Sequence, residues 1–135
     1  MYAKDQSEVT MNNFKVSNTT LTKDSAFYIF ECRLNVNNLK ITDSIFQKNI
    51  LGVRESYANF TNIELVRSHS HTGTPLHIKK NKILTVENFT VIDSRCSHDN
   101  GFFIYDCDNV FFKNLKIMDS IFQSEILEVR SEVIC

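Results

Sequence analysis

The sequence repeats itself at long range, and this repeat constrains the fold more than any other feature. Residues 38–47 read NLKITDSIFQ and residues 114–123 read NLKIMDSIFQ, so nine of the ten positions agree. Self-similarity with a period of roughly 20–50 residues is the signature of solenoid architectures. Asparagines mark successive copies at steps of 25, 24, 26 and 26 residues: Asn13, Asn38, Asn62, Asn88 and Asn114.

Every repeat places apolar residues at the same four offsets from its asparagine. The offsets are four and two residues before the asparagine, and one and three residues after it. All twenty of these residues are apolar, although only 42% of the chain is hydrophobic. They are Val9, Leu34, Ala58, Leu84, Val110; Met11, Val36, Phe60, Val86, Phe112; Phe14, Leu39, Ile63, Phe89, Leu115; and Val16, Ile41, Leu65, Val91, Ile117. We expect these four columns to form the core of a stack of equivalent coils.

The spacing within one repeat is typical of strands. Val110 and Phe112 alternate with period two before the asparagine, as Leu115 and Ile117 do after it. An amphipathic helix would instead need apolar residues at positions i, i+3, i+4 and i+7. A further alternating pair precedes each later repeat: Phe27/Ile29, Leu51/Val53, Leu76/Ile78, Phe102/Ile104 and Leu127/Val129. The sequence therefore predicts three short strands per coil, bent at the asparagine and at two other corners.

Asparagine is also the residue that we expect to make the turns. The chain has 14 asparagines but only three glycines and one proline. Asparagine tolerates the left-handed backbone conformation better than most residues.

The stretch V-x-F-x-N-L-x-I-x-D-S at residues 110–120 and the asparagine ladder resemble the right-handed parallel β-helix of the pectin lyase-like superfamily. The resemblance covers nearly the whole chain. It implies an all-β, single-stranded solenoid of about five coils of 24–26 residues, with three short strands per coil. Leucine-rich repeats are the alternative, since they have a similar period and also stack an asparagine. Three strand signals per repeat, without a leucine-rich consensus, favour the β-helix.

We expect residues 1–135 to form a single β-helix domain that is an internal fragment of a larger repeat-containing surface protein. Neither end shows the polar cap that solenoids need. Uncapped ends would favour end-to-end stacking of copies.

The charge balance and hydropathy argue against a nucleic-acid partner and against a membrane span. Lys and Arg number 15 against 16 Asp and Glu, without a basic block, which argues against a nucleic-acid partner. No apolar run reaches the roughly 20 residues that span a bilayer.

Outward positions of the first predicted strand form the candidate ligand-binding face. One column reads Phe30, Arg54, Lys79, Tyr105 and Arg130, and its neighbour contains Tyr28 and Phe103. Aromatic rings beside cations on a flat sheet can stack on sugar rings and hold carboxylates. The alternative is that these cations only stack on the rings and keep the sheet soluble.

The acidic, histidine and cysteine residues predict no metal site and no cofactor. Two corner columns contain carboxylates: Glu31, Glu55, Lys80, Asp106 and Asp43, Arg67, Asp93, Asp119. An aspartate before a serine at a bend is normally turn chemistry. The histidines have no fixed spacing: His69, His71, His77 and His98. Without a CxxC pair, the cysteines are expected to be buried thiols: Cys32, Cys96, Cys107 and Cys135.

These observations lead us to expect a non-catalytic structural or adhesion segment, at the cell surface or secreted. Its partner would be a polysaccharide or another protein, bound through the exposed sheet face. The resemblance implies an alternative, a uronate lyase or glycoside hydrolase. In that alternative Arg54 and Lys79 would contact uronate, and Glu31, Glu55 or Asp106 would act as acid, base or cation ligand.

Overall fold

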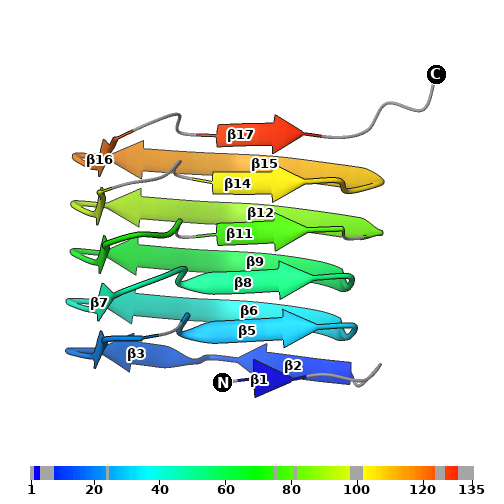
Figure 1. Cartoon of the computed structure of the whole chain (residues 1–135), viewed down its shortest axis with the longest axis horizontal. Helices are drawn as coiled ribbons and strands as arrows, with labels where there is room; N and C mark the ends of the chain where they lie inside the picture. The colour runs from blue at the N-terminus through cyan, green and yellow to red at the C-terminus, as the bar shows by residue number, and fades with distance from the viewer. Residues whose placement is uncertain are drawn as a thin grey trace.

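The chain winds into a stack of coils made of parallel strands (Figure 1). The computed structural model describes residues 2–3, 8–23, 25–74, 76–80, 82–97, 102–123 and 127–130. Every regular element in these residues is a strand, and they contain no helix suited to crossing a membrane. The fold is therefore an all-β parallel β-solenoid, as the repeat predicts, and the leucine-rich alternative is wrong.

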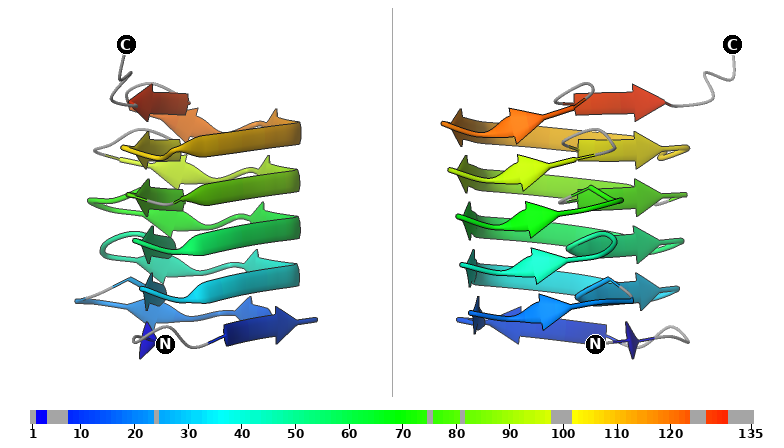
Figure 2. Two further views of the ribbon diagram at one scale, coloured as in Figure 1. Left: turned by 90° about the vertical axis from the view of Figure 1, so that its right-hand side faces the viewer. Right: turned by 60° about the vertical axis from the view of Figure 1, so that its left-hand side comes forward.

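Three parallel sheets each take one strand from every complete coil. Sheet A contains β1 (Tyr2–Ala3), β5 (Phe27–Phe30), β8 (Leu51–Arg54), β11 (Leu76–Lys79), β14 (Phe102–Tyr105) and β17 (Leu127–Arg130). Sheet B contains β2 (Glu8–Asn12), β3 (Lys15–Ser17), β6 (Arg33–Thr42), β9 (Tyr57–Val66), β12 (Ile83–Ile92) and β15 (Asn109–Met118). Sheet C contains β4 (Thr20–Leu21), β7 (Ile45–Phe46), β10 (His69–Ser70), β13 (Arg95–Cys96) and β16 (Ile121–Phe122). The four coils from β5 to β16 have the full strand set, and Figure 2 shows them stacked one above another.

The division of each coil into strands differs from the predicted one. In the four complete coils the segments on either side of the asparagine form one ten-residue strand, such as β6, which bends at Asn38. In the first coil they are two strands, β2 and β3, on either side of Asn13. The third strand is a two-residue segment, such as β7, that the sequence analysis missed. Three strands per coil is the right number, but the predicted boundary between the second and third strands was wrong in the four complete coils.

The asparagines bend sheet B and bond to one another, as the ladder predicts. Asn13, Asn38, Asn62, Asn88 and Asn114 have positive φ angles between 54° and 58°. From Asn38 onward, each Nδ2 donates a hydrogen bond of 2.8–2.9 Å to Oδ1 of the asparagine one coil earlier. The ladder therefore satisfies the amides and fixes the register between coils at the same time.

The corners at the two ends of the long sheet B strand also use left-handed residues, and in the four complete coils these are charged. The corner between sheets A and B has Glu31, Glu55, Lys80 and Asp106, with φ of 53–56°. The corner between sheets B and C has Asp43, Arg67, Asp93 and Asp119, with φ of 45–52°. The expectation that aspartate before serine is turn chemistry is confirmed at this second corner.

A residue with a small hydroxyl or thiol follows the left-handed residue at these corners, except after Lys80, and closes the corner. Ser56 Oγ donates to the carbonyl of Arg54 at 2.8 Å and accepts from the backbone N–H of Cys32 in the preceding coil at 3.1 Å. Ser94 repeats this pattern at the second corner, where its Oγ donates to Ile92 O and accepts from Ser68 N–H. These side chains supply partners for buried backbone groups that the turn removes from the ladder.

The four predicted apolar columns line the interior between the sheets. Their members in β6, β9 and β12 are all buried, and Phe60 and Phe89 have no exposed surface. The prediction that Phe14 belongs to the buried core was wrong, because this residue is 43% exposed. Its ring packs edge-on against that of Phe27, with 5.6 Å between the ring centres. It lies in the coil of β2 and β3, which among the described strands of sheet B has a neighbour on one side only, β6.

Three of the four cysteines are buried, as expected for thiols: Cys32, Cys96 and Cys107. Cys135 lies outside the described residues.

Candidate binding face and corner groove

The outward side chains of sheet A form the columns that the sequence predicts. The register pairs Phe30 with Arg54, Arg54 with Lys79, and Lys79 with Tyr105. The neighbouring column pairs Tyr28 with Gly52, and His77 with Phe103. Arg130 pairs with Tyr105 through the backbone, and its side chain lies outside the described part of the molecule.

Contacts between coils hold this face in place. The Arg54 guanidinium carbon lies 5.5 Å from the centre of the Phe30 ring, and Lys79 Nζ lies 5.2 Å from that of Tyr105. The rings of His77 and Phe103 stack at 5.1 Å. Such contacts are worth about 0.5–1 kcal/mol each at exposed sites.

Glycine at position 52 leaves room for an aromatic ring above it. A Cβ at Gly52 would meet the Tyr28 ring at 3.0 Å, so Tyr28 lies close over the backbone of β8. All described side chains of this face are half-buried, and they form a continuous surface of rings and cations.

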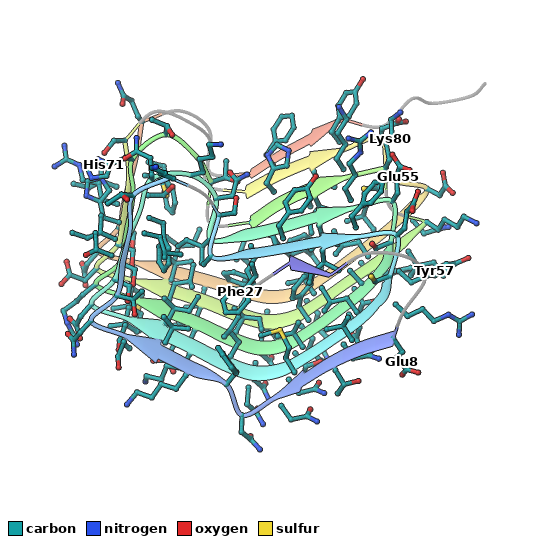
Figure 3. The ribbon with its side chains drawn as sticks, turned by 60° about the horizontal axis from the view of Figure 1, so that its bottom comes forward. Glu8, Phe27, Glu55, Tyr57, His71 and Lys80 are labelled. Carbon is teal, nitrogen blue, oxygen red and sulfur yellow. The ribbon has the colours of Figure 1, made fainter. Side chains whose placement is uncertain are left out.

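A groove lies at the corner where sheet A turns into sheet B. Its volume is about 630 Å³, and it is lined by Glu31, Cys32, Arg33, Glu55, Tyr57, Lys80 and Lys82. Glu55, Tyr57 and Lys80 gather at one side of the solenoid in Figure 3, whereas His71 lies at the opposite side. A smaller hollow of about 360 Å³ on the outer face of sheet B shares Arg33 and Tyr57 with the groove.

A change in corner length between coils explains this groove. Arg54 and Tyr57 are three positions apart, whereas their register partners Lys79 and Ile83 are four apart. The additional residue brings Lys82 N–H to the carbonyl of Ser56 at 3.2 Å, just as Tyr57 N–H bonds to Cys32 O in the coil below. The longer corner between Lys79 and Ile83 therefore lies next to the shorter corner between Arg54 and Tyr57 in the stack.

Tyr57 lies between two cations in the groove. The Arg33 guanidinium carbon and Lys82 Nζ each lie 5.6 Å from the centre of the Tyr57 ring. Arg33 is in register with Tyr57 from the coil below, and Lys82 comes from the coil above. The sequence analysis missed Arg33, Tyr57 and Lys82, and the only signal for them was the one-residue change in corner length.

The carboxylates of the first corner column do not form a shared cluster. Glu55 Oε1 accepts a hydrogen bond of 2.9 Å from Arg54 Nε. Among the described residues, no group of three His, Cys, Asp or Glu side chains could hold a metal ion.

Two histidines meet at the opposite side of the solenoid. The rings of His69 and His71 lie 4.3 Å apart, and His69 Nε2 is 2.6 Å from Ser97 Oγ. Burial lowers the pKa of His69, and the nearby His71 and Arg95 lower it further. His98 lies outside the described residues.

The candidate site therefore has two adjoining parts, the sheet A face and the corner groove. The face was predicted, and the groove adds cations beside it. Comparisons with protein-family models, curated proteins and solved structures found no match to this chain.

Proposed function

We propose that this chain is a non-catalytic adhesion segment that binds a saccharide chain through the outer face of sheet A. One observation carries the proposal: rings and cations are held in register on a parallel sheet, with Arg54 on Phe30 and Lys79 on Tyr105. Flat rings that are already ordered lose little side-chain entropy when a sugar ring stacks on them.

We also propose that the solenoid belongs to the pectin lyase-like architecture. The asparagine ladder and the left-handed bend at each anchor support this assignment. Fold alone does not imply an activity, so the enzymatic alternative needs its own test.

Affinity electrophoresis in gels containing soluble polysaccharide tests the binding function. We expect Tyr105→Ala to weaken retardation about tenfold, since one stacked ring is lost. Phe111→Ala is the matched control, because Phe111 is an aromatic side chain 60% exposed on the outer face of sheet B. Equal retardation of both variants would contradict the proposal.

A depolymerisation assay on polyuronate, with and without Ca²⁺, addresses the lyase or hydrolase alternative. We expect no turnover. Turnover that is abolished by Arg54→Ala would replace the adhesion proposal with an enzymatic one.

A further inference from the structure

We infer that the corner groove binds the oxyanion groups, carboxylate or sulfate ester, of a saccharide chain that lies along sheet A. The inference deepens the proposed function and rests on it, because the face would bind the sugar rings and the groove would select their charge. The lining residues that carry the argument are Arg33, Tyr57, Lys80 and Lys82.

The charges of the groove favour an anion. Three cations and two carboxylates line it, and one of the carboxylates, Glu55, is already paired with Arg54 at 2.9 Å. Within the described part of the chain, no carboxylate forms an ion pair with Arg33, Lys80 or Lys82. Among the described residues that line the groove, Glu31 is then the one carboxylate without an ion pair, whereas three cations have none.

The cations are also positioned before any ligand binds. Arg33 and Lys82 both lie 5.6 Å from the centre of the Tyr57 ring, on the two coils that flank it. Strand spacing in a sheet is about 4.8 Å, so two cations separated by two coils stand about 10 Å apart along the solenoid axis. A linear chain with acidic groups at intervals can meet both cations, whereas a single small anion meets only one.

The groove also joins the proposed face directly. Lys79, on the outer face of sheet A, is followed in the chain by Lys80 of the groove. The same adjacency links Arg54 to Glu55. A saccharide lying on the rings of sheet A therefore has its substituents beside the groove.

Three polymers with one backbone test the inference: dextran, dextran sulfate and carboxymethyl dextran. Dissociation constants are measured for the whole chain by affinity electrophoresis at low and at physiological salt. We expect the two charged polymers to bind more tightly than dextran. The double variant Arg33→Gln/Lys82→Gln should bind the charged polymers about tenfold more weakly than the parent chain does.

The double variant Lys15→Gln/Lys116→Gln is the charge-matched control. Both lysines are exposed on the other half of sheet B, away from the groove. It should keep the affinity for the charged polymers. If both double variants lose the same affinity for the charged polymers, the effect comes from net charge alone, and the inference is overturned.

Variants of Tyr57 separate positioning from charge. Tyr57→Phe keeps the ring under both cations and should bind the charged polymers as the parent chain does. Tyr57→Ala should lose several-fold affinity without any change in charge. Thermal melting of each variant identifies any that fail to fold.

The outcomes distinguish this inference from the proposed function. Charged polymers that bind no better than dextran overturn the groove inference, even where Tyr105→Ala still weakens binding. No effect of Tyr105→Ala on any polymer contradicts the sheet-face function, whatever the groove variants do. Preference for only one charged polymer supports the inference and identifies which oxyanion the groove takes.

Discussion

Three bends of each complete coil, one within the long sheet B strand and one at each of its ends, have a residue in the left-handed conformation, and the identity of that residue decides what else the bend does. Asn62, like its equivalents in the other coils, bends the strand, and its side-chain amide forms a hydrogen bond with the asparagine of the preceding coil. Charged residues at the other corners have no amide ladder. Some of them form ion pairs, such as Arg67, which donates two hydrogen bonds of 2.6 and 2.9 Å to Asp43.

Replacing Asn62 measures what the ladder contributes. Asn62→Ala removes a bond to Asn38 and one from Asn88, and it forces alanine into a φ of 56°. We expect the free energy of unfolding to fall by about 2–3 kcal/mol in urea titrations. Asn62→Gly is the control, because glycine adopts this φ freely and should cost about 1 kcal/mol less. Equal losses would show that backbone strain contributes nothing.

The pKa of His69 makes stability depend on pH. Burial, His71 and Arg95 lower the pKa of the folded state below the ordinary value near 6.5, while the unfolded chain still takes up its proton there. The unfolded state therefore binds more protons as the pH falls below 6.5, and the free energy of unfolding decreases. NMR titration of the ring should give a pKa below 6.5, and Arg95→Gln should raise it. A value at or above 6.5 in the parent chain would contradict this assignment.

At the scale of the element, period-two alternation was enough to find the long strands but not the short ones. Val36 with Leu34, and Leu39 with Ile41, display the alternation within β6. The strands of sheet C have two residues each, too few to alternate. Their inward residues also differ in character, as Phe46, Ser70 and Cys96 show. The break predicted at Asn38 was wrong because one left-handed residue bends a strand without ending its hydrogen-bond ladder.

The candidate site likewise has one part that could be predicted from the sequence and one part that could not. The columns of sheet A could be predicted, because Arg54 and Lys79 occupy the same position in equivalent strands and therefore lie beside each other in the sheet. The corner groove could not, since it arises from one additional residue between Lys79 and Ile83. Periodicity describes what the coils share, whereas the groove depends on where two coils differ.

Substitutions of Ser56 test whether its side-chain hydrogen bonds stabilise the corner. Ser56→Ala leaves the buried N–H of Cys32 without its partner, which typically costs about 1–3 kcal/mol. Ser56→Cys should cost less than half of that, because Cys32 already closes the equivalent corner with Sγ 3.1 Å from the Phe30 carbonyl. Urea unfolding followed by circular dichroism gives both values. A cysteine variant as unstable as the alanine variant would show that the hydrogen bond is not what matters.

At the scale of the whole molecule, stability is a sum over contacts between neighbouring coils. Exposed ion pairs join adjacent coils on sheet B, as Lys40 with Glu64 at 2.8 Å and Lys113 with Glu87 at 2.7 Å. Such pairs are worth at most about 1 kcal/mol each. The apolar columns are therefore the main source of stability, and a column residue should matter in proportion to how well both of its neighbours enclose it.

Two phenylalanines of one column provide this comparison. Phe60 has no exposed surface and is paired in register on both sides, with Val36 and Val86. Phe112 follows Val86 in the same column and is only partly buried. We expect Phe60→Ala to lower the free energy of unfolding by about 3–5 kcal/mol, and Phe112→Ala by about half as much, since less apolar surface is lost from its contacts. Both values come from urea titrations monitored at the same signal. If Phe112→Ala is as destabilising as Phe60→Ala, the column does not act through enclosure by neighbouring coils, and the additive description of the solenoid fails.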